Sequence, residues 1–183
     1  MIPGLRYVPA YLAQADHDAL LATVGALDWQ AAGGRRIQFY GHWYDHGKGG
    51  IYRVGDLPPW AAALAGRVCD DGLMPYLADQ LIVTEYQPGE GIRPHVDATT
   101  FADVIVGVTL GSACVMEFVR AGHATEAVLL EPGSALVFSD DARYEWQHAI
   151  PARTADDWHG QHLPRSRRVS LTFRKTLGKE ART

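Results

Sequence analysis

The sequence predicts an α+β protein in which N-terminal helices precede a β-sandwich or jelly roll. Two stretches with apolar residues at helical spacing lie in the first 80 of the 183 residues, and short apolar runs separated by turns follow. The 19 glycines and 10 prolines have no repeat period, which favours many turns and a body rich in strands. Because 47% of the residues are hydrophobic and 21% are charged, we expect a folded domain with a sizeable core.

Two helices are expected after a short strand at residues 5–9. The first helix spans residues 16–27, where apolar residues recur at helical spacing behind an aspartate that can serve as the N-cap. The second spans residues 60–77, because two consecutive prolines mark a helix start just before it. Between the helices, residues 29–44 are rich in glycine, arginine and aromatic residues and indicate a turn followed by a short strand or hairpin.

The second half of the chain predicts a series of short strands, about eight in number. The clearest of them lie at residues 81–86, 104–110, 113–119, 128–130, 134–138 and 169–173. Two helices followed by these strands indicate one α+β domain.

Charge and cysteine content place limits on the partners and the compartment. The net charge is −4, with basic segments at residues 33–53 and 165–179. Cys69 and Cys114 have neither metal-binding nor redox spacing, so we expect a reducing, cytoplasmic setting. The longest apolar run, residues 104–116, is too short to span a membrane. A chain of this size needs no disulfide or partner subunit to fold, and we expect a monomer.

Candidate metal ligands lie at His95, Asp97 and His148. Alternation along a strand places His95 and Asp97 on one face, so an imidazole and a carboxylate can bind one cation. Two histidines and one carboxylate leave coordination positions open, as in non-haem Fe(II) oxygenases. His148 is favoured as the third ligand because it lies in an apolar setting, whereas His159 and His162 lie in residues 154–164, a polar stretch that indicates a loop. Taken alone, the His-x-Asp pattern is also that of an ordinary polar pair, which stays open as the alternative.

The strand at residues 168–174 alternates between apolar and polar residues. Its apolar residues share one face, and Arg168 and Arg174 lie on the other face with two hydroxyl residues. The polar face either meets water at a sheet edge or lines the mouth of a barrel. In the second case the two guanidinium groups can bind a dicarboxylate, and Arg174 can also bind a ligating carboxylate.

Together these patterns resemble the AlkB family of Fe(II)/2-oxoglutarate dioxygenases, over residues 36–174. The motifs that carry the resemblance are Tyr86-x-x-Gly89, His95-x-Asp97, His148 and Arg168 with Arg174 six residues later. The resemblance implies a double-stranded β-helix (jelly roll) with N-terminal helices packed against it. It also implies Fe(II), 2-oxoglutarate and O₂ as cofactors, with His95, Asp97 and His148 as the catalytic iron ligands.

Four further residues acquire cosubstrate roles through the same resemblance. Tyr86 and Arg168 would bind the distal carboxylate of 2-oxoglutarate. Arg174 would lie near its proximal carboxylate and near Asp97. Thr84 stands where many members have asparagine, and its hydroxyl can still donate a hydrogen bond.

The resemblance also implies a substrate lid near the N-terminus. Residues 35–41 are similar to the start of the family's nucleotide-recognition lid, so Arg35 and Arg36 are candidate phosphate contacts. Tyr40, Trp43 and Tyr44 are candidates to stack on an unpaired base, and each can equally belong to a packed hairpin.

The activity that the resemblance implies is oxidative dealkylation or hydroxylation of a modified nucleobase in DNA or RNA. The turn at residues 89–92, just before His95, most resembles the corresponding sequence in the branch that hydroxylates wobble uridines in tRNA. Thr99, a further candidate substrate contact, stands where several DNA-repair members carry an acidic residue. A base in a duplex must leave the stack to reach the iron, which favours single-stranded DNA, RNA or tRNA loops as partners.

We expect a single domain over residues 1–183, with the helices and lid in residues 1–80 and the jelly-roll core in residues 81–175. Three alternatives stay open at this point. The same scaffold can oxidise a protein or a small molecule, or it can serve as a binding module without activity. A metal hydrolase also explains the metal ligands, but it leaves Arg168 and Arg174 without a ligand.

Overall fold

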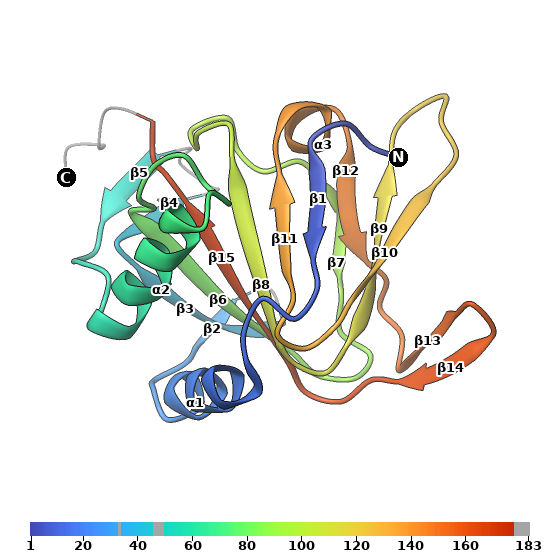
Figure 1. Ribbon diagram of the computed structural model, residues 1–183, viewed down its shortest axis with the longest axis horizontal. Helices are drawn as coiled ribbons and strands as arrows, with labels where there is room; N and C mark the ends of the chain where they lie inside the picture. The colour runs from blue at the N-terminus through green and yellow to red at the C-terminus, as the bar shows by residue number, and fades with distance from the viewer. Residues whose placement is uncertain (33, 46–49, 178–183) are drawn as a thin grey trace.

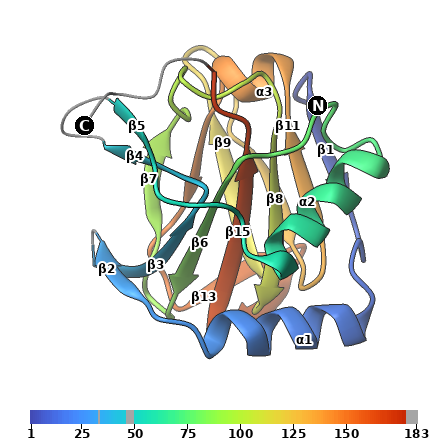
Figure 2. The same cartoon turned by 90° about the vertical axis from the view of Figure 1, so that its left-hand side faces the viewer.

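Two facing β-sheets form the body of the protein, and helices α1 and α2 cover the outer face of the larger sheet (Figures 1 and 2). The computed structural model describes residues 1–32, 34–45 and 50–177. Every strand pair in these ranges is antiparallel. The elements in chain order are β1 (Leu5–Val8), α1 (Gln14–Gly25), β2 (Gln30–Ala32), β3 (Arg35–Tyr40), β4 (His42–Asp45), β5 (Gly50–Arg53), α2 (Pro59–Asp70), β6 (Gln80–Tyr86), β7 (Ile92–His95), β8 (Ile105–Gly111), β9 (Cys114–Val119), β10 (Glu126–Leu130), β11 (Ala135–Phe138), α3 (Asp140–Tyr144), β12 (Gln147–Ile150), β13 (Ala155–Trp158), β14 (Gln161–Pro164) and β15 (Arg168–Arg174).

The strand order confirms the predicted double-stranded β-helix. The larger sheet runs β1-β11-β8-β15-β6-β3-β2, and the smaller one runs β10-β9-β12-β7. The larger sheet therefore combines strands from the first 80 residues (β1, β2 and β3) with strands from the rest of the chain. Two separate hairpins, β4–β5 and β13–β14, extend from this body.

Strand β15 lies at the centre of the larger sheet, between β8 and β6, and not at a solvated edge. Val169, Leu171 and Phe173 are fully buried in the core that α1 and α2 share with this sheet. Arg168 and Arg174 point to the opposite face, into the space between the two sheets. The period-two alternation of this strand thus separates the residues that build the core from those that can do chemistry.

A second core fills the closed part of the space between the sheets. It includes Ile105, Phe118 and Phe138, all nearly inaccessible to solvent. The open part of the same space is the cleft described below.

Helix α2 ends at Asp70, seven residues before the expected boundary. Gly72 follows with a φ of +67°, a conformation that terminates the helix and that glycine adopts without strain. The sequence indicated a longer helix because apolar residues continue beyond Asp70. Leu73 and Met74 are buried in the core, but they lie after the end of the helix. Within the described ranges, no helix is long and apolar enough to cross a membrane.

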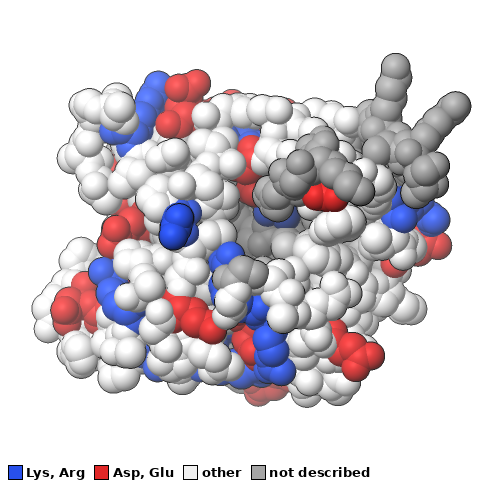
Figure 3. Space-filling view, turned by 180° about the vertical axis from the view of Figure 1, so that it is seen from behind, with Lys and Arg blue, Asp and Glu red and all other residues white. Residues whose placement is uncertain are grey.

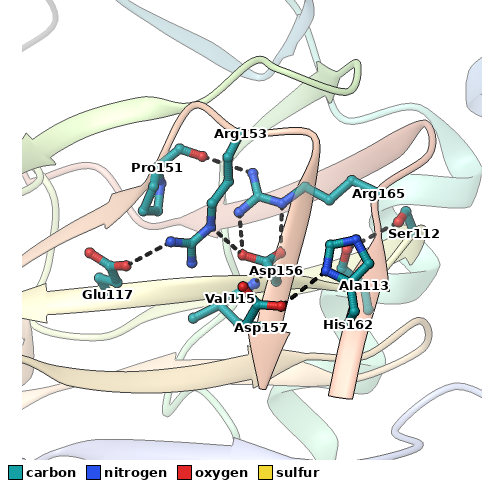
Figure 4. A network of polar contacts seen from close by, with 10 residues as sticks. All are labelled: Ser112, Ala113, Val115, Glu117, Pro151, Arg153, Asp156, Asp157, His162 and Arg165. Atoms are coloured by element: carbon teal, nitrogen blue, oxygen red, sulfur yellow. Dashed lines mark hydrogen bonds and ion pairs between the residues drawn. The ribbon is translucent and has the colours of Figure 1, made fainter. Parts of the chain in front are cut away.

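The β13–β14 hairpin occupies a stretch that the sequence indicated as a loop. The carboxylate of Asp156, 1% exposed, accepts hydrogen bonds from Arg165 at 2.6 and 2.7 Å, from Arg153 at 2.7 Å and from the backbone N–H of Val115 at 3.1 Å (Figure 4). This network fixes the base of the hairpin to β9, because a buried carboxylate with four donors is fully compensated.

Candidate active site

The three predicted metal ligands meet on the inner face of the smaller sheet. His95 on β7 and His148 on β12 are cross-strand partners, and their ring centroids lie 4.3 Å apart. Asp97 lies two residues past the end of β7, and ligand atoms from all three residues lie within 4.8 Å of one another. Two imidazoles and one carboxylate at this spacing fit a divalent iron with open coordination positions.

Hydrogen bonds orient two of these ligands. The Nδ1 atom of His95 lies 2.8 Å from the carbonyl oxygen of Arg93. A carbonyl only accepts, so Nδ1 carries the proton and Nε2 is free to bind a metal. Arg174 donates to Oδ1 of Asp97 at 2.7 Å, and both side chains are 12% exposed. This ion pair leaves Oδ2 of Asp97 available to the metal.

The electrostatics keep Asp97 and His148 in the forms that bind a cation. Burial alone would raise the pKa of Asp97, but the positive charge of Arg174 outweighs it and lowers the pKa to about 2. Burial lowers the pKa of His148 to about 4. The site therefore holds an ionised carboxylate and a neutral imidazole at neutral pH, as metal binding requires.

Arg168 provides the clearest evidence for a bound anion. It is 4% exposed and donates from Nη2 to Oγ1 of Thr109 at 3.0 Å, while its Nε and Nη1 atoms are buried without a partner. A buried guanidinium with two unpaired donors is costly unless a ligand completes it. Tyr86 is the cross-strand partner of Arg168. Together they fit the distal carboxylate of 2-oxoglutarate, to which a guanidinium can donate two parallel hydrogen bonds.

These residues share one cleft of about 990 Å³ between the two sheets. Its walls include the three metal ligands and Tyr86, Arg168, Arg174 and Thr84. The whole polar face of β15 lines this cleft, together with alternate residues of β6. The structure thus brings together every residue that the resemblance assigned to iron or to the cosubstrate.

The candidate substrate contacts divide according to strand alternation. Arg35 lines the cleft on β3, whereas Arg36 points to the other face and donates to Glu85 at 2.7 Å. Tyr40 also lies on that other face, with its ring 5.6 Å from that of Trp60. Thr99 is exposed in the loop after Asp97 and does not line the cleft.

Trp43 and Tyr44, on β4, both line the cleft. The ring of Trp43 packs 5.7 Å from that of Tyr52, and the ring of Tyr44 lies 6.0 Å from that of Phe101. Gly41, with a φ of +75°, forms the turn into β4, and a Cβ atom there would collide with the carbonyl oxygen of Asp79. Only glycine therefore fits this turn, which aims the aromatic strand at the cleft.

Two contributors to the site carried no signal in the sequence. Arg143 on α3 is 2% exposed and donates to the carbonyl oxygens of Asp97 and Ala98 at 2.9 and 2.7 Å. It also donates to the carbonyls of Phe101 and Ala102, both at 3.2 Å, so this one side chain holds the loop that carries Asp97, a candidate metal ligand. Gln80 lines the cleft and accepts a hydrogen bond from Arg174 at 3.2 Å.

Fold and site together define an Fe(II)- and 2-oxoglutarate-dependent oxygenase. The family model of the 2OG-Fe(II) oxygenase superfamily matches residues 4–174. The chain belongs to this superfamily and, within it, is an AlkB-like member. Its cofactors are accordingly Fe(II), 2-oxoglutarate and O₂.

Similar proteins come from a virus, a plant and an animal. The chain is 32% identical to the uncharacterized protein L905 of Acanthamoeba polyphaga mimivirus, over 95% of this chain and 85% of the viral protein. It is 34% identical to the alkylated DNA repair protein ALKBH8 homolog of Arabidopsis thaliana, over 95% of this chain but only 58% of that protein. It is 28% identical to tRNA (carboxymethyluridine(34)-5-O)-methyltransferase alkbh8 of Xenopus tropicalis, over 94% of this chain and 32% of that protein.

Solved structures share the fold at low sequence identity. The structure of OsALKBH1 superposes with a TM-score of 0.76 at 14% identity, covering 96% of this chain and 98% of that one. A prolyl-4-hydroxylase from Pseudomonas putida superposes with a TM-score of 0.63 at 18% identity, over 96% and 94% of the two chains. The fold therefore leaves the substrate to be argued from the cleft.

Proposed function

We propose that this protein oxidatively dealkylates or hydroxylates a modified nucleobase in single-stranded DNA or in RNA, including tRNA. The observation that carries the proposal is an aromatic wall that the β4 strand and its neighbours place in the metal cleft. Relatives that are named for alkylated DNA repair and for tRNA modification support the same class of substrate.

The aromatic wall consists of Phe39, Trp43, Tyr44 and Phe101, which all line the cleft. Planar aromatic side chains bind unpaired bases by stacking, worth about 1–3 kcal/mol per base. At about 990 Å³, the cleft is at the upper end of the usual range for ligand pockets, so it has room for a nucleotide beside the cosubstrate. A base inside a duplex cannot reach this wall without leaving the stack.

The residues of the chain divide the work of the reaction between them. When bound, Fe(II), 2-oxoglutarate and O₂ supply the oxidising chemistry that attacks a substrate C–H bond. His95, Asp97 and His148 would hold the metal, and Arg168 with Tyr86 would hold the cosubstrate in one orientation. The aromatic wall excludes water and holds the base in a fixed orientation beside the metal site, which lowers the entropy cost of bringing the reacting groups together.

The surface charge supports recognition through the base more than through the backbone. Basic and acidic residues are interspersed on the face seen in Figure 3, and the net charge of the chain is −4. A protein that neutralises few phosphates shows a shallow salt dependence of binding. We therefore expect stacking in the cleft to dominate the affinity for the substrate strand.

The test is a product screen by mass spectrometry. The protein is incubated with Fe(II) and 2-oxoglutarate and with methylated single-stranded DNA, methylated RNA, tRNA or peptides. Loss of a methyl group or gain of an oxygen on a nucleic acid, absent from the Asp97→Ala variant, is the expected result. Product on peptides alone would contradict the proposal and would favour a protein oxygenase on the same scaffold.

We propose further that the protein is a cytoplasmic monomer. Cys69 and Cys114 are both free thiols, which supports a reducing compartment. Light scattering coupled to size exclusion tests the monomer, and microscopy of a tagged chain tests the compartment.

A further inference from the structure

The side chain of Arg35, on β3, points into the cleft towards Tyr86, a residue of the candidate cosubstrate site. Its Nη1 atom donates to the hydroxyl oxygen of Tyr86 at 3.2 Å. The centre of its guanidinium group lies 5.3 Å from the centroid of the Tyr86 ring, and that of Arg168 lies 5.4 Å from the same centroid. Two cations therefore share one buried tyrosine.

The direction of the hydrogen bond decides what Tyr86 can do. A guanidinium has only donors, so the Tyr86 oxygen accepts from Arg35 and its own proton is free. Tyr86 is 8% exposed, and burial raises its pKa, so the hydroxyl stays protonated. A protonated hydroxyl with its oxygen already engaged is a pre-oriented donor for an anion in the cleft.

The neighbouring charges also call for an anion. Arg168 carries two buried donors without a partner, and Arg35 lines the same cleft. Two guanidinium groups beside one ring repel each other unless a negative charge lies nearby. A carboxylate that accepts from both Arg168 and Tyr86 supplies that charge.

We propose that Arg35 is a positioning residue for 2-oxoglutarate, which acts through the hydroxyl of Tyr86, and is not a phosphate contact for nucleic acid. Arg35 aims the Tyr86 proton at the distal carboxylate of the cosubstrate. Because Arg35 belongs to β3, next to β2 at the edge of the sheet, it links this edge of the cleft to cosubstrate binding. The inference holds whichever substrate the enzyme oxidises.

The experiment is a double-mutant cycle on cosubstrate binding. The dissociation constant of 2-oxoglutarate is measured by anaerobic calorimetry on the Mn(II)-loaded protein for wild type, Arg35→Gln, Tyr86→Phe and the double variant. Loss of one hydrogen bond should weaken binding by about three- to tenfold in Arg35→Gln. If Arg35 acts through the hydroxyl, the double variant should bind 2-oxoglutarate no more weakly than Tyr86→Phe alone.

A matched control separates this effect from a general loss of charge. Arg53→Gln removes one positive charge from β5, where Arg53 pairs with the exposed Asp56 and does not line the cleft. This variant should bind 2-oxoglutarate as wild type does. Thermal unfolding of the metal-free variants checks that Arg35→Gln remains folded.

Two results would overturn the inference. Additive losses in the double variant would show that Arg35 does not act through Tyr86. Unchanged 2-oxoglutarate affinity in Arg35→Gln would also contradict the inference. If the KM for the nucleic acid rises in the same variant, Arg35 contacts the substrate instead. Because binding of the cosubstrate is measured without any nucleic acid, failure here is distinguishable from failure of the proposed function.

Discussion

Replacement of Arg143 by methionine should destabilise the loop that carries Asp97, a candidate metal ligand. Arg143 lies on α3, and its four hydrogen bonds reach carbonyl oxygens between Asp97 and Ala102, at 2.7 to 3.2 Å. Methionine keeps much of the apolar stem and removes every donor. The loop then loses these four hydrogen bonds to α3, and Asp97 is no longer held in position.

The magnitude follows from burial and from the number of bonds. Each hydrogen bond to a charged donor contributes about 1.5–3 kcal/mol, and Arg143 makes four of them while 2% exposed. The desolvation of the guanidinium offsets part of this sum, and water can satisfy some of the carbonyls in the variant. We therefore expect the free energy of unfolding to fall by about 3–5 kcal/mol, as for other broken buried charge networks. Metal affinity should fall by about 10- to 100-fold, because Arg143 orients the ligand Asp97.

Urea unfolding of the metal-free protein and Mn(II) titration measure these two effects. Arg120→Met is the matched control, since Arg120 is a partly exposed arginine that pairs with Asp141 on α3 and with Glu145 just after it. Its loss should cost less than about 1 kcal/mol and leave metal affinity unchanged. Equal destabilisation in the two variants, or wild-type metal affinity in Arg143→Met, would refute the reasoning.

Three further predictions concern the ligands and the hairpin. Asp97→Ala should abolish the conversion of 2-oxoglutarate to succinate, followed by mass spectrometry, and retained turnover would remove Asp97 from the ligand set. Acid should weaken the fold and release the metal: the pKa of His148 is lowered from 6.5 to about 4, so its neutral form stabilises the folded state fully above about pH 6.5, and this stability is lost as the pH falls towards 4. Melting curves and metal analysis from pH 7 to 4 measure both effects, and His148→Asn should lose this part of the pH dependence. Asp156→Asn should lower the free energy of unfolding in urea by about 3–5 kcal/mol, because Arg153 and Arg165 lose a buried partner, while succinate formation stays near wild type; a loss of less than about 1 kcal/mol would contradict this.

The metal site was readable from the sequence because its signal is local chemistry. His95 and Asp97 lie two residues apart, and the extended backbone keeps both side chains on one side, although β7 itself ends at His95. The strand at residues 168–174 was equally readable, since its apolar face predicts a core and its polar face then points to the cleft. In both cases the information is that residues two apart in an extended segment lie on the same side of the backbone.

Arg143 could not be found in this way, because its partners are backbone carbonyls more than 40 residues earlier in the chain. Any residue type supplies a carbonyl, so no pattern marks such a contact. Arg35 and Arg36 show a different limit. Both faces of β3 carry polar and aromatic residues, so the sequence did not reveal which arginine faces the cleft and which pairs with Glu85.

The β13–β14 hairpin was not predicted, because its residues are mostly polar and charged. Asp156 lies in a run of polar residues that indicates a loop, and it is buried only because Arg153 and Arg165 accompany it. The sequence sign of a hairpin was the glycine at position 160. In the structure, His159 and Gly160 form a two-residue turn with φ values of +49° and +81°.

The central position of β15 restricts how this enzyme can be redesigned. The same seven-residue backbone anchors the helices through Leu171 and presents Arg168 and Arg174 to the cleft, so a change in side-chain volume behind the sheet would also move the guanidinium groups in front of it. The β4–β5 hairpin, by contrast, contributes Trp43 and Tyr44 without taking part in either of the two main sheets. New substrate preferences should therefore be sought by exchanging or grafting that hairpin, with β15 left unchanged.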